Sequence, residues 1–303
     1  TMDREKITSD ITFMNDLVKN ANENLDIDRL AIVGIGEPFL SPNTPELINF
    51  SKSIGLPVAI QTNGAHPKKA KEFLKKIKWL GLSLQTITRD AYKTKSFSKK
   101  FELYMKDVFS IIDESKRQKK KIVLSILLKR KTLLTDFFFL RKKYISIYNQ
   151  ILFIYPFLKI LSIKYGKPKQ SFFNVFTDYK LNFGNFLEIN IDDMTDWMKE
   201  ISIYQENSGI TFIPSTKGTC RIFNAGPMIL ADRRVAICCV DATGKTSIGK
   251  LIDSDINSFL INSKKYTKIK ESFDKNEVYD STCQKCLSKL KFIITSGLKN
   301  KSI

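Results

Sequence analysis

Four cysteines in the last third of the sequence have a spacing that suits a metal site. The chain has 303 residues and five cysteines, none of them within residues 1–219. Four thiolates can hold one [4Fe-4S] cluster or one tetrahedral zinc ion, and spacing alone does not choose between these metals. The fifth thiol, Cys239, is interpreted as a small buried side chain. The four candidate ligands form a C-x17-C-x44-C-x2-C pattern: Cys220, Cys238, Cys283 and Cys286.

Three short segments in the first half of the chain carry groups that could bind a ligand. Glycines let a backbone approach a ligand closely, and the carboxylate that follows them could take a ligand ammonium group. Each segment alone is a weak signal, because an ordinary turn or a buried hydroxyl would look the same. The segments are Gly34-Ile35-Gly36-Glu37-Pro38, Thr62-Asn63-Gly64 and Ser83-Leu84-Gln85-Thr86.

Each of these segments follows a predicted strand. Short β-branched runs alternate with helical patterns of ten to twenty residues, which predicts repeated βα units and a parallel sheet. Ligands bind outside the carboxyl ends of such strands, so three polar strand ends predict one site on one rim. The predicted strands are Leu30–Val33, Val58–Gln61, Leu80–Leu84, Ile122–Leu128 and Leu158–Ile163; the predicted helices are Ser9–Asn24, Pro45–Ser53, Pro67–Lys76, Lys99–Lys119 and Leu133–Ile151.

The second half is predicted to be less regular. Residues 166–190 are rich in Lys, Pro, Asn and Phe and are interpreted as a linker or an elaborated loop. A helix over Ile191–Gln205 and a short strand over Ile210–Ile213 then lead into the cysteine-bearing segment. There, Val235–Ile237 is predicted to be a hairpin strand that delivers Cys238, and we expect Asp241 to have a structural role.

The first half resembles the radical S-adenosylmethionine (SAM) superfamily, over nearly all of residues 1–165. The resemblance implies an α/β fold, a partial (β/α)6 barrel whose first strand is missing here. It also implies SAM-binding roles for the polar segments. The glycine-rich loop would bind the amino group of SAM, and the end of the third predicted strand would face its ribose and carboxylate. The implied SAM-binding residues are Gly34, Gly36, Glu37, Pro38, Thr62, Asn63, Ser83 and Gln85.

The C-x3-C-x2-C loop that defines this superfamily is absent from the sequence. Counting back from Gly34 places that loop at or before residue 1, so we expect that the chain is truncated rather than degenerate. Three thiolates of the loop hold the catalytic [4Fe-4S] cluster, which is therefore expected only in the complete protein. An inactive homologue that binds SAM or a peptide without chemistry remains an alternative.

The cysteine-bearing segment resembles the SPASM or twitch auxiliary-cluster domains that follow many radical SAM barrels. The resemblance implies one auxiliary [4Fe-4S] cluster on Cys220, Cys238, Cys283 and Cys286, and four ligands suit the shorter twitch form. The match departs at Arg233-Arg234, where a glycine turn is usual, and at Lys250, where Asn is common. The predicted organisation is a partial barrel over residues 1–165, a linker with one helix over 166–214, and an α+β iron-sulfur domain with a β-hairpin over 215–303.

Composition gives broader expectations. The net charge is +19, but the Lys residues are scattered, so solvated helix faces explain them better than nucleic acid does. No signal peptide or apolar span is evident, which predicts a cytoplasmic protein without membrane contact. The single histidine, His66, is predicted to lie in a surface turn, and a lone histidine argues against triad hydrolases.

These observations predict a radical SAM oxidoreductase or maturase-type enzyme. It would generate a 5′-deoxyadenosyl radical that abstracts hydrogen from a peptide or a sugar-like polyol, with electrons from a flavodoxin-like or ferredoxin-like donor. No single catalytic residue is identified, and the chain alone would be inactive without the catalytic cluster cysteines. The competing hypothesis is a non-catalytic zinc-binding basic module that binds nucleic acid, with affinity falling steeply as salt rises.

Overall fold

The computed structural model of this chain describes two compact units. One unit is Asp28–Met194, and the other combines Thr1–Ile27 with Thr195–Ile303. This division differs from the boundary predicted at residue 165, and the functional domains remain a prediction. The structure describes residues 7–34, 36–84, 87, 100–128, 154–172, 180–193, 210–213, 216–238, 241, 244–284 and 291–294. Ile35, Gln85, Thr86, Cys239, Cys286 and the predicted helix Leu133–Ile151 lie outside the described residues.

The unit Asp28–Met194 contains a six-stranded sheet with strand order β1-β2-β3-β4-β6-β5. The first five of these strands run parallel, and β5 pairs antiparallel with β6. In the described part of the chain the sheet is open, with β1 and β5 at its edges. The predicted parallel α/β fold is confirmed. The strands are β1 (Leu30–Ile32), β2 (Val58–Thr62), β3 (Trp79–Leu84), β4 (Ile122–Leu128), β5 (Lys180–Phe183) and β6 (Leu187–Asp193).

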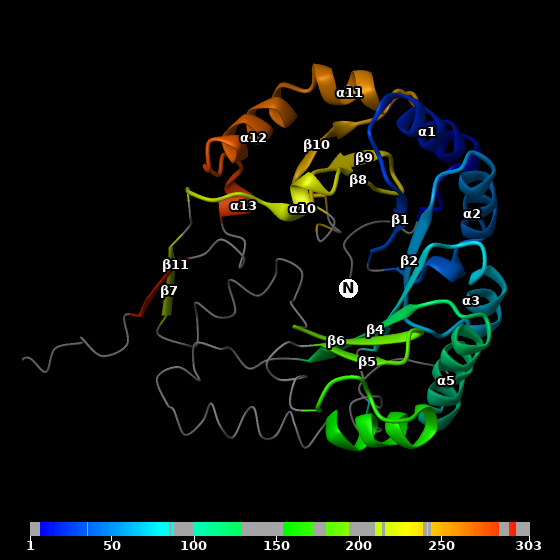
Figure 1. The fold of residues 1–303 in the computed structure, drawn as a ribbon. Coiled ribbons are helices and arrows are strands. Elements are labelled where there is room, and N and C mark those ends of the chain that lie inside the picture. The colour runs from blue at the N-terminus through cyan, green and yellow to red at the C-terminus, as the bar shows by residue number, and fades with distance from the viewer. Residues whose placement is uncertain are drawn as a thin grey trace, which may run out of the picture. The chain divides into compact units, whose positions relative to one another are not determined.

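Helices cover one face of this sheet, and Figure 1 shows them along one side of the strands. Alternate strand residues such as Leu80, Leu82 and Leu84 are fully buried, because side chains i and i+2 of a strand share a face. They belong to one apolar core with the inward faces of the helices. The helical elements of this unit are η1 (Pro38–Leu40), α2 (Thr44–Ser53), α3 (Pro67–Phe73), α5 (Phe101–Arg117) and residues 154–165.

Three predictions in this unit were wrong. Residues 158–163 were predicted to be a strand, but residues 154–165 form a helix. Ile154, Phe157, Leu158 and Leu161 are buried at the i, i+3, i+4, i+7 spacing of one helix face. Conversely, the segment interpreted as a linker over 166–190 contains β5 and the start of β6, and residues 191–193 are strand rather than the start of a helix.

The second unit joins an N-terminal helix to the cysteine-bearing segment. Phe13 and Leu17 of α1 share an apolar cluster with Val235, Ile256 and Leu260. Asp10 caps α1, and its carboxylate accepts hydrogen bonds from Thr12 N at 3.0 Å and Phe13 N at 3.4 Å. The elements of this unit are α1 (Ile11–Asn24), β7 (Ile210–Ile213), α10 (Arg221–Asn224), β8 (Met228–Ile229), β9 (Arg234–Ala236), β10 (Ser247–Lys250), α11 (Ile256–Asn262), α12 (Lys264–Asp274), α13 (Ser281–Gln284) and β11 (Lys291–Ile294).

Strands β8, β9 and β10 form an antiparallel sheet with β9 in the middle, and β7 pairs with β11. The predicted strand at Ile210–Ile213 and the predicted hairpin strand are therefore confirmed. Among the described residues, no helix is long and apolar enough to cross a membrane.

Candidate functional site

The Glu37 carboxylate ties the loop after β1 to the loop after β2. Thr62 Oγ1 donates to Glu37 Oε1 at 2.6 Å, and Asn63 N donates to Glu37 Oε2 at 2.8 Å. Phe39 N also donates to Oε1 at 3.2 Å, at the start of η1. Hydrogen bonds to a charged acceptor are stronger than neutral ones, so this carboxylate organises both loops. The sequence placed Glu37 at the site but gave it only a ligand ammonium group as a partner.

The two glycines of the first loop have different structural roles. Gly34 has φ of 144°, a conformation that L side chains rarely adopt. Gly36 has no such constraint, and a Cβ added to it meets no described atom within 4 Å. The backbone conformation at position 34 therefore favours glycine in the folded chain. The open space at Gly36 is available to a ligand. This space fits the close approach expected for SAM.

The segment after β2 is a preformed turn. Ala65 N donates to Asn63 Oδ1 at 2.8 Å, and Gly64 N donates to Thr62 Oγ1 at 3.2 Å. Gly64 takes φ of 77°, and Tyr104 Oη donates to the carbonyl oxygen of Asn63 at 3.0 Å. The local bonds satisfy Thr62 and Asn63 without a ligand, because Asn side chains readily cap their own turn. Residues 34–38, 62–64 and 83 are hereafter called the rim loops.

Ser83, at the end of β3, is held by a residue that the sequence analysis missed. Gln61 Nε2 donates a hydrogen bond to Ser83 Oγ. The Gln61 side chain crosses Gly81, where an added Cβ would overlap both Gln61 Oε1 and the Trp79 ring. Glycine at position 81 is therefore what allows Gln61 to reach Ser83. The strand alternation that places Gln61 and Ser83 on one face was the signal available in the sequence.

The sheet face opposite the helices carries further polar side chains. Ser83 is paired in register with Ser125 of β4, and Ser125 with Asn190 of β6. We call Ser83, Ser125 and Asn190 the polar row. Ser125 was not predicted as a site residue, and neither was Asn190, because the start of β6 was interpreted as a linker.

Glu188 lies on the same face of β6 as Asn190. Lys121 Nζ lies 2.7 Å and Lys180 Nζ 3.3 Å from its carboxylate oxygens. Desolvation tends to raise the pKa of Glu188, but the hydrogen bonds and charges of these lysines outweigh it, so its pKa is lowered. The carboxylate near the polar row is consequently ionised and neutralised by its neighbours.

The described cysteines lie around a second apolar cluster. Cys220 and Cys283 both pack against the cluster formed by Phe223, Ile237, Ile269, Phe273 and Val278. Cys238 directly follows Ile237. Within the described ranges, no group of three or more His, Cys, Asp or Glu side chains could hold a metal ion. The thiol chemistry suits a cluster, but the described thiols alone do not assemble one.

Asp241 organises the turn that follows these cysteines. Its side chain is 1% exposed and accepts hydrogen bonds from Gly244 N at 2.9 Å and Thr246 Oγ1 at 2.7 Å. Thr246 N donates to the same carboxylate. These bonds confirm the structural role that was predicted for Asp241.

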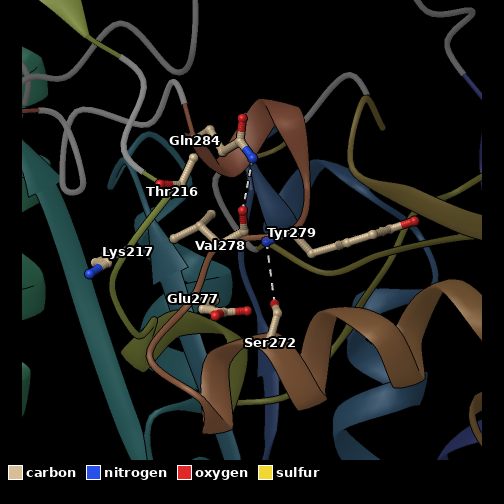
Figure 2. A pocket seen from close by; sticks show the side chains of 7 residues that line it. All are labelled: Thr216, Lys217, Ser272, Glu277, Val278, Tyr279 and Gln284. Atoms are coloured by element: carbon tan, nitrogen blue, oxygen red, sulfur yellow. Dashed lines mark hydrogen bonds between the residues drawn. The ribbon is translucent and has the colours of Figure 1, made fainter.

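A cavity of about 340 Å³ lies in the same unit. Figure 2 shows Gln284 donating to the carbonyl oxygen of Val278 and Tyr279 N donating to Ser272, at 2.8 and 3.3 Å. None of the predicted site residues that the structure describes lines this cavity. Its lining residues are Thr216, Lys217, Ser272, Glu277, Val278, Tyr279 and Gln284.

Comparison with known proteins gives structural relatives only. No protein-family model matches the sequence, and no curated protein does. The chain is similar to the crystal structure of Streptococcus suis SuiB bound to precursor peptide SuiA, with a TM-score of 0.53 and 15% identity. That match covers 93% of this chain and 65% of the SuiB chain, so this chain spans less than two thirds of it.

Two further structures match less well. SuiB bound to S-adenosylmethionine has a TM-score of 0.46 at 14% identity and covers 94% of this chain and 72% of that one. The crystal structure of archaeal TYW1 has a TM-score of 0.27 at 22% identity, and the match covers 40% of this chain and 44% of the TYW1 chain. The first match confirms the kind of fold that was predicted from the sequence, and it shows the fold alone.

Proposed function

We propose that this chain is the SAM-binding and auxiliary-cluster part of a radical SAM enzyme that oxidises or matures a peptide. The observation that carries the proposal is the pair of rim loops joined by Glu37, with open space above Gly36. The proposed SAM ligands are those of the sequence analysis: the loop Gly34–Pro38, Thr62, Asn63, Ser83 and Gln85.

The residues of the rim loops would bind and orient SAM. The backbone at Gly36 would approach the amino group of SAM, while Glu37 holds the two loops at a fixed separation. Ser83, fixed by Gln61, would donate or accept a hydrogen bond at the ribose. Bound there beside a reduced [4Fe-4S] cluster, SAM would supply the radical chemistry that removes a hydrogen atom from the substrate.

A peptide substrate is favoured over a polyol. SuiB, whose fold this chain shares, is bound to a precursor peptide in the matching structure. The net charge of +19 would also attract an acidic peptide segment. A flavodoxin-like or ferredoxin-like protein would supply the electron, and an auxiliary [4Fe-4S] cluster would bind at Cys220, Cys238, Cys283 and Cys286.

The test is to extend the coding sequence upstream and to prepare the extended protein without oxygen. We expect a C-x3-C-x2-C motif upstream, brown protein, and release of 5′-deoxyadenosine from SAM after addition of dithionite. Colourless protein that contains zinc, or iron-loaded protein that leaves SAM intact, would refute the proposal.

Gly36→Ala and Gly34→Ala make a matched pair for the SAM site. We expect Gly36→Ala to lower the affinity for SAM by about tenfold or more with an unchanged melting temperature, because its methyl group occupies ligand space only. Gly34→Ala should lower the melting temperature as well, because alanine resists φ of 144°. If Gly36→Ala binds SAM normally, the ligand does not lie against this loop.

A further inference from the structure

The polar row continues from the proposed SAM site onto the next two strands of the sheet. Ser83, Ser125 and Asn190 are register partners on β3, β4 and β6, so their side chains stand on one face at one level. Neighbouring strands lie about 4.8 Å apart, which puts Ser125 one strand spacing and Asn190 two spacings from Ser83. A group bound at Ser125 would therefore lie beside a cofactor bound at Ser83.

Ser125 has an unused hydroxyl at this position. Its residue is 8% exposed, and no hydrogen bond of Ser125 Oγ is present within the described part of the chain. A hydroxyl on a sheet face without a partner in the described protein can donate to or accept from a ligand or water. Asn190 is half-buried, and its carboxamide nitrogen donates to Glu188 Oε1 at 3.2 Å, which leaves its carboxamide oxygen to accept from a ligand.

The polar groups of the row limit the chemistry of its ligand. The row contains hydroxyl and carboxamide groups, and Lys180 of β5 is the next register partner, beside Asn190. Glu188, on the same face, is paired with both Lys121 and Lys180, so its carboxylate is not left for a ligand cation. Neutral donors and acceptors suit amide or hydroxyl groups better than a phosphate or a carboxylate.

The length of the row favours an amide chain. From Ser83 to Asn190 it spans two strand spacings, or roughly 9.5 Å. An extended peptide advances about 3.3–3.6 Å per residue, so three residues match this span, whereas a single sugar ring is shorter. We propose that Ser125 and Asn190 bind amide groups of an extended stretch of a peptide substrate next to the cofactor. This inference rests on the proposed function and deepens it.

The proposal separates two affinities that can be measured independently. Isothermal titration gives the affinity for SAM. Saturation-transfer NMR, without SAM, gives binding of N-acetyl-trialanine amide as the amide probe and of myo-inositol as the polyol probe. We expect Ser125→Ala and Asn190→Leu to weaken the tripeptide about fivefold to tenfold, as loss of a buried hydrogen bond does, with SAM affinity unchanged. Ser83→Ala should weaken SAM instead.

Control variants exclude effects on folding. Ser125→Thr keeps a hydroxyl and suits a strand, so it should restore tripeptide binding. Ser110→Ala on α5 and Asn49→Leu on α2 remove the same groups from the helices, and they should change neither affinity. Melting temperatures identify any variant that fails to fold. If Asn190→Leu does not fold, the comparison of Ser125→Ala with Ser125→Thr decides the test.

Three results would overturn the inference. Equal loss of SAM affinity in Ser83→Ala and Ser125→Ala would assign the row to the cofactor. If Ser125→Ala binds the tripeptide as wild type does, the row is not part of the substrate site. If Ser125→Ala weakens the binding of myo-inositol but not of the tripeptide, the row is a polyol site. Failure of the proposed function is a different result, since it appears as absent SAM binding in the wild-type chain while the tripeptide experiment still reports on the row.

Discussion

The rim loops and the cysteine region were both predicted as sites, and they differ in what holds them together. The rim loops are connected by hydrogen bonds of the protein itself, from Thr62 and Asn63 to Glu37 and from Gln61 to Ser83. Cys220 and Cys283 pack against the same apolar cluster, and within the described part of the chain the thiols do not form a metal-binding group. A site made of backbone turns and a carboxylate can form before its ligand binds, whereas thiolates are brought together by the metal that neutralises them.

The largest expected effect is on the cysteine region. Cys220→Ser should lower the iron content of anaerobically reconstituted protein by about four atoms per chain, because one ligand of the auxiliary cluster is lost. Hydrogen exchange should then increase around β9 and α12 and stay unchanged at the rim loops. Iron analysis and exchange mass spectrometry measure both. An unchanged iron content would show that Cys220 is not a ligand and would remove the contrast between the two regions.

Glu37→Gln tests the preformed rim. The amide cannot accept at both oxygen positions, so at least one of the donors Thr62, Asn63 and Phe39 loses its partner. We expect a loss of about 1–3 kcal/mol in the free energy of unfolding and weaker SAM binding. Denaturant titration and calorimetry measure these changes. Glu46→Gln, at an exposed position of α2, is the control. Unaltered stability in Glu37→Gln would mean that the rim loops do not depend on this carboxylate.

A smaller effect is expected where α1 meets the hairpin. The Arg233 guanidinium lies 4.0 Å from the centroid of the Phe13 ring and 3.4 Å from Asp10 Oδ2. Arg233→Ala should destabilise the protein by about 0.5–1 kcal/mol through loss of the cation–π contact. Asp10→Ser keeps a capping hydroxyl, so it tests the ion pair separately. If Arg233→Ala has the same free energy of unfolding as wild type in chemical denaturation, Arg233 does not stabilise the protein. The arginine at this turn, where a glycine is usual, would then have no structural role.

The smallest expected effect is the pH dependence of Glu188. Its folded-state pKa lies below the ordinary 4.5, so the ionised group stabilises the fold above pH 4.5 and loses this contribution as pH falls through the lowered pKa. The stability difference between wild type and Glu188→Gln should thus be constant near neutral pH and shrink below about pH 4.5. Urea titrations at several pH values measure it. A difference that persists unchanged at pH 3 would contradict the pairing with Lys121 and Lys180.

The wrong predictions at residues 154–165 and at β6 have one physical cause. In residues 154–165, exposed Ile160 and Ile163 add apolar residues to a helix whose buried face has the usual spacing, so the segment resembled a short continuous strand. In β6, the alternation of buried Leu187 and Ile189 with polar Glu188 and Asn190 is a strand pattern, but it follows a loop rich in polar residues. Local composition obscured periodicity in both places.

The sequence by itself determined the parallel α/β fold, the loops at the ends of β1, β2 and β3, and a thiol set suited to a cluster. Spacing, turn chemistry and hydrophobic alternation are local properties, so they can be read along the chain. Only the tertiary structure decided that Glu37 joins two loops, that Gln61 crosses Gly81 to reach Ser83, and that α1 packs with the hairpin. Those contacts depend on strand order, register and packing between distant segments, which no local pattern encodes.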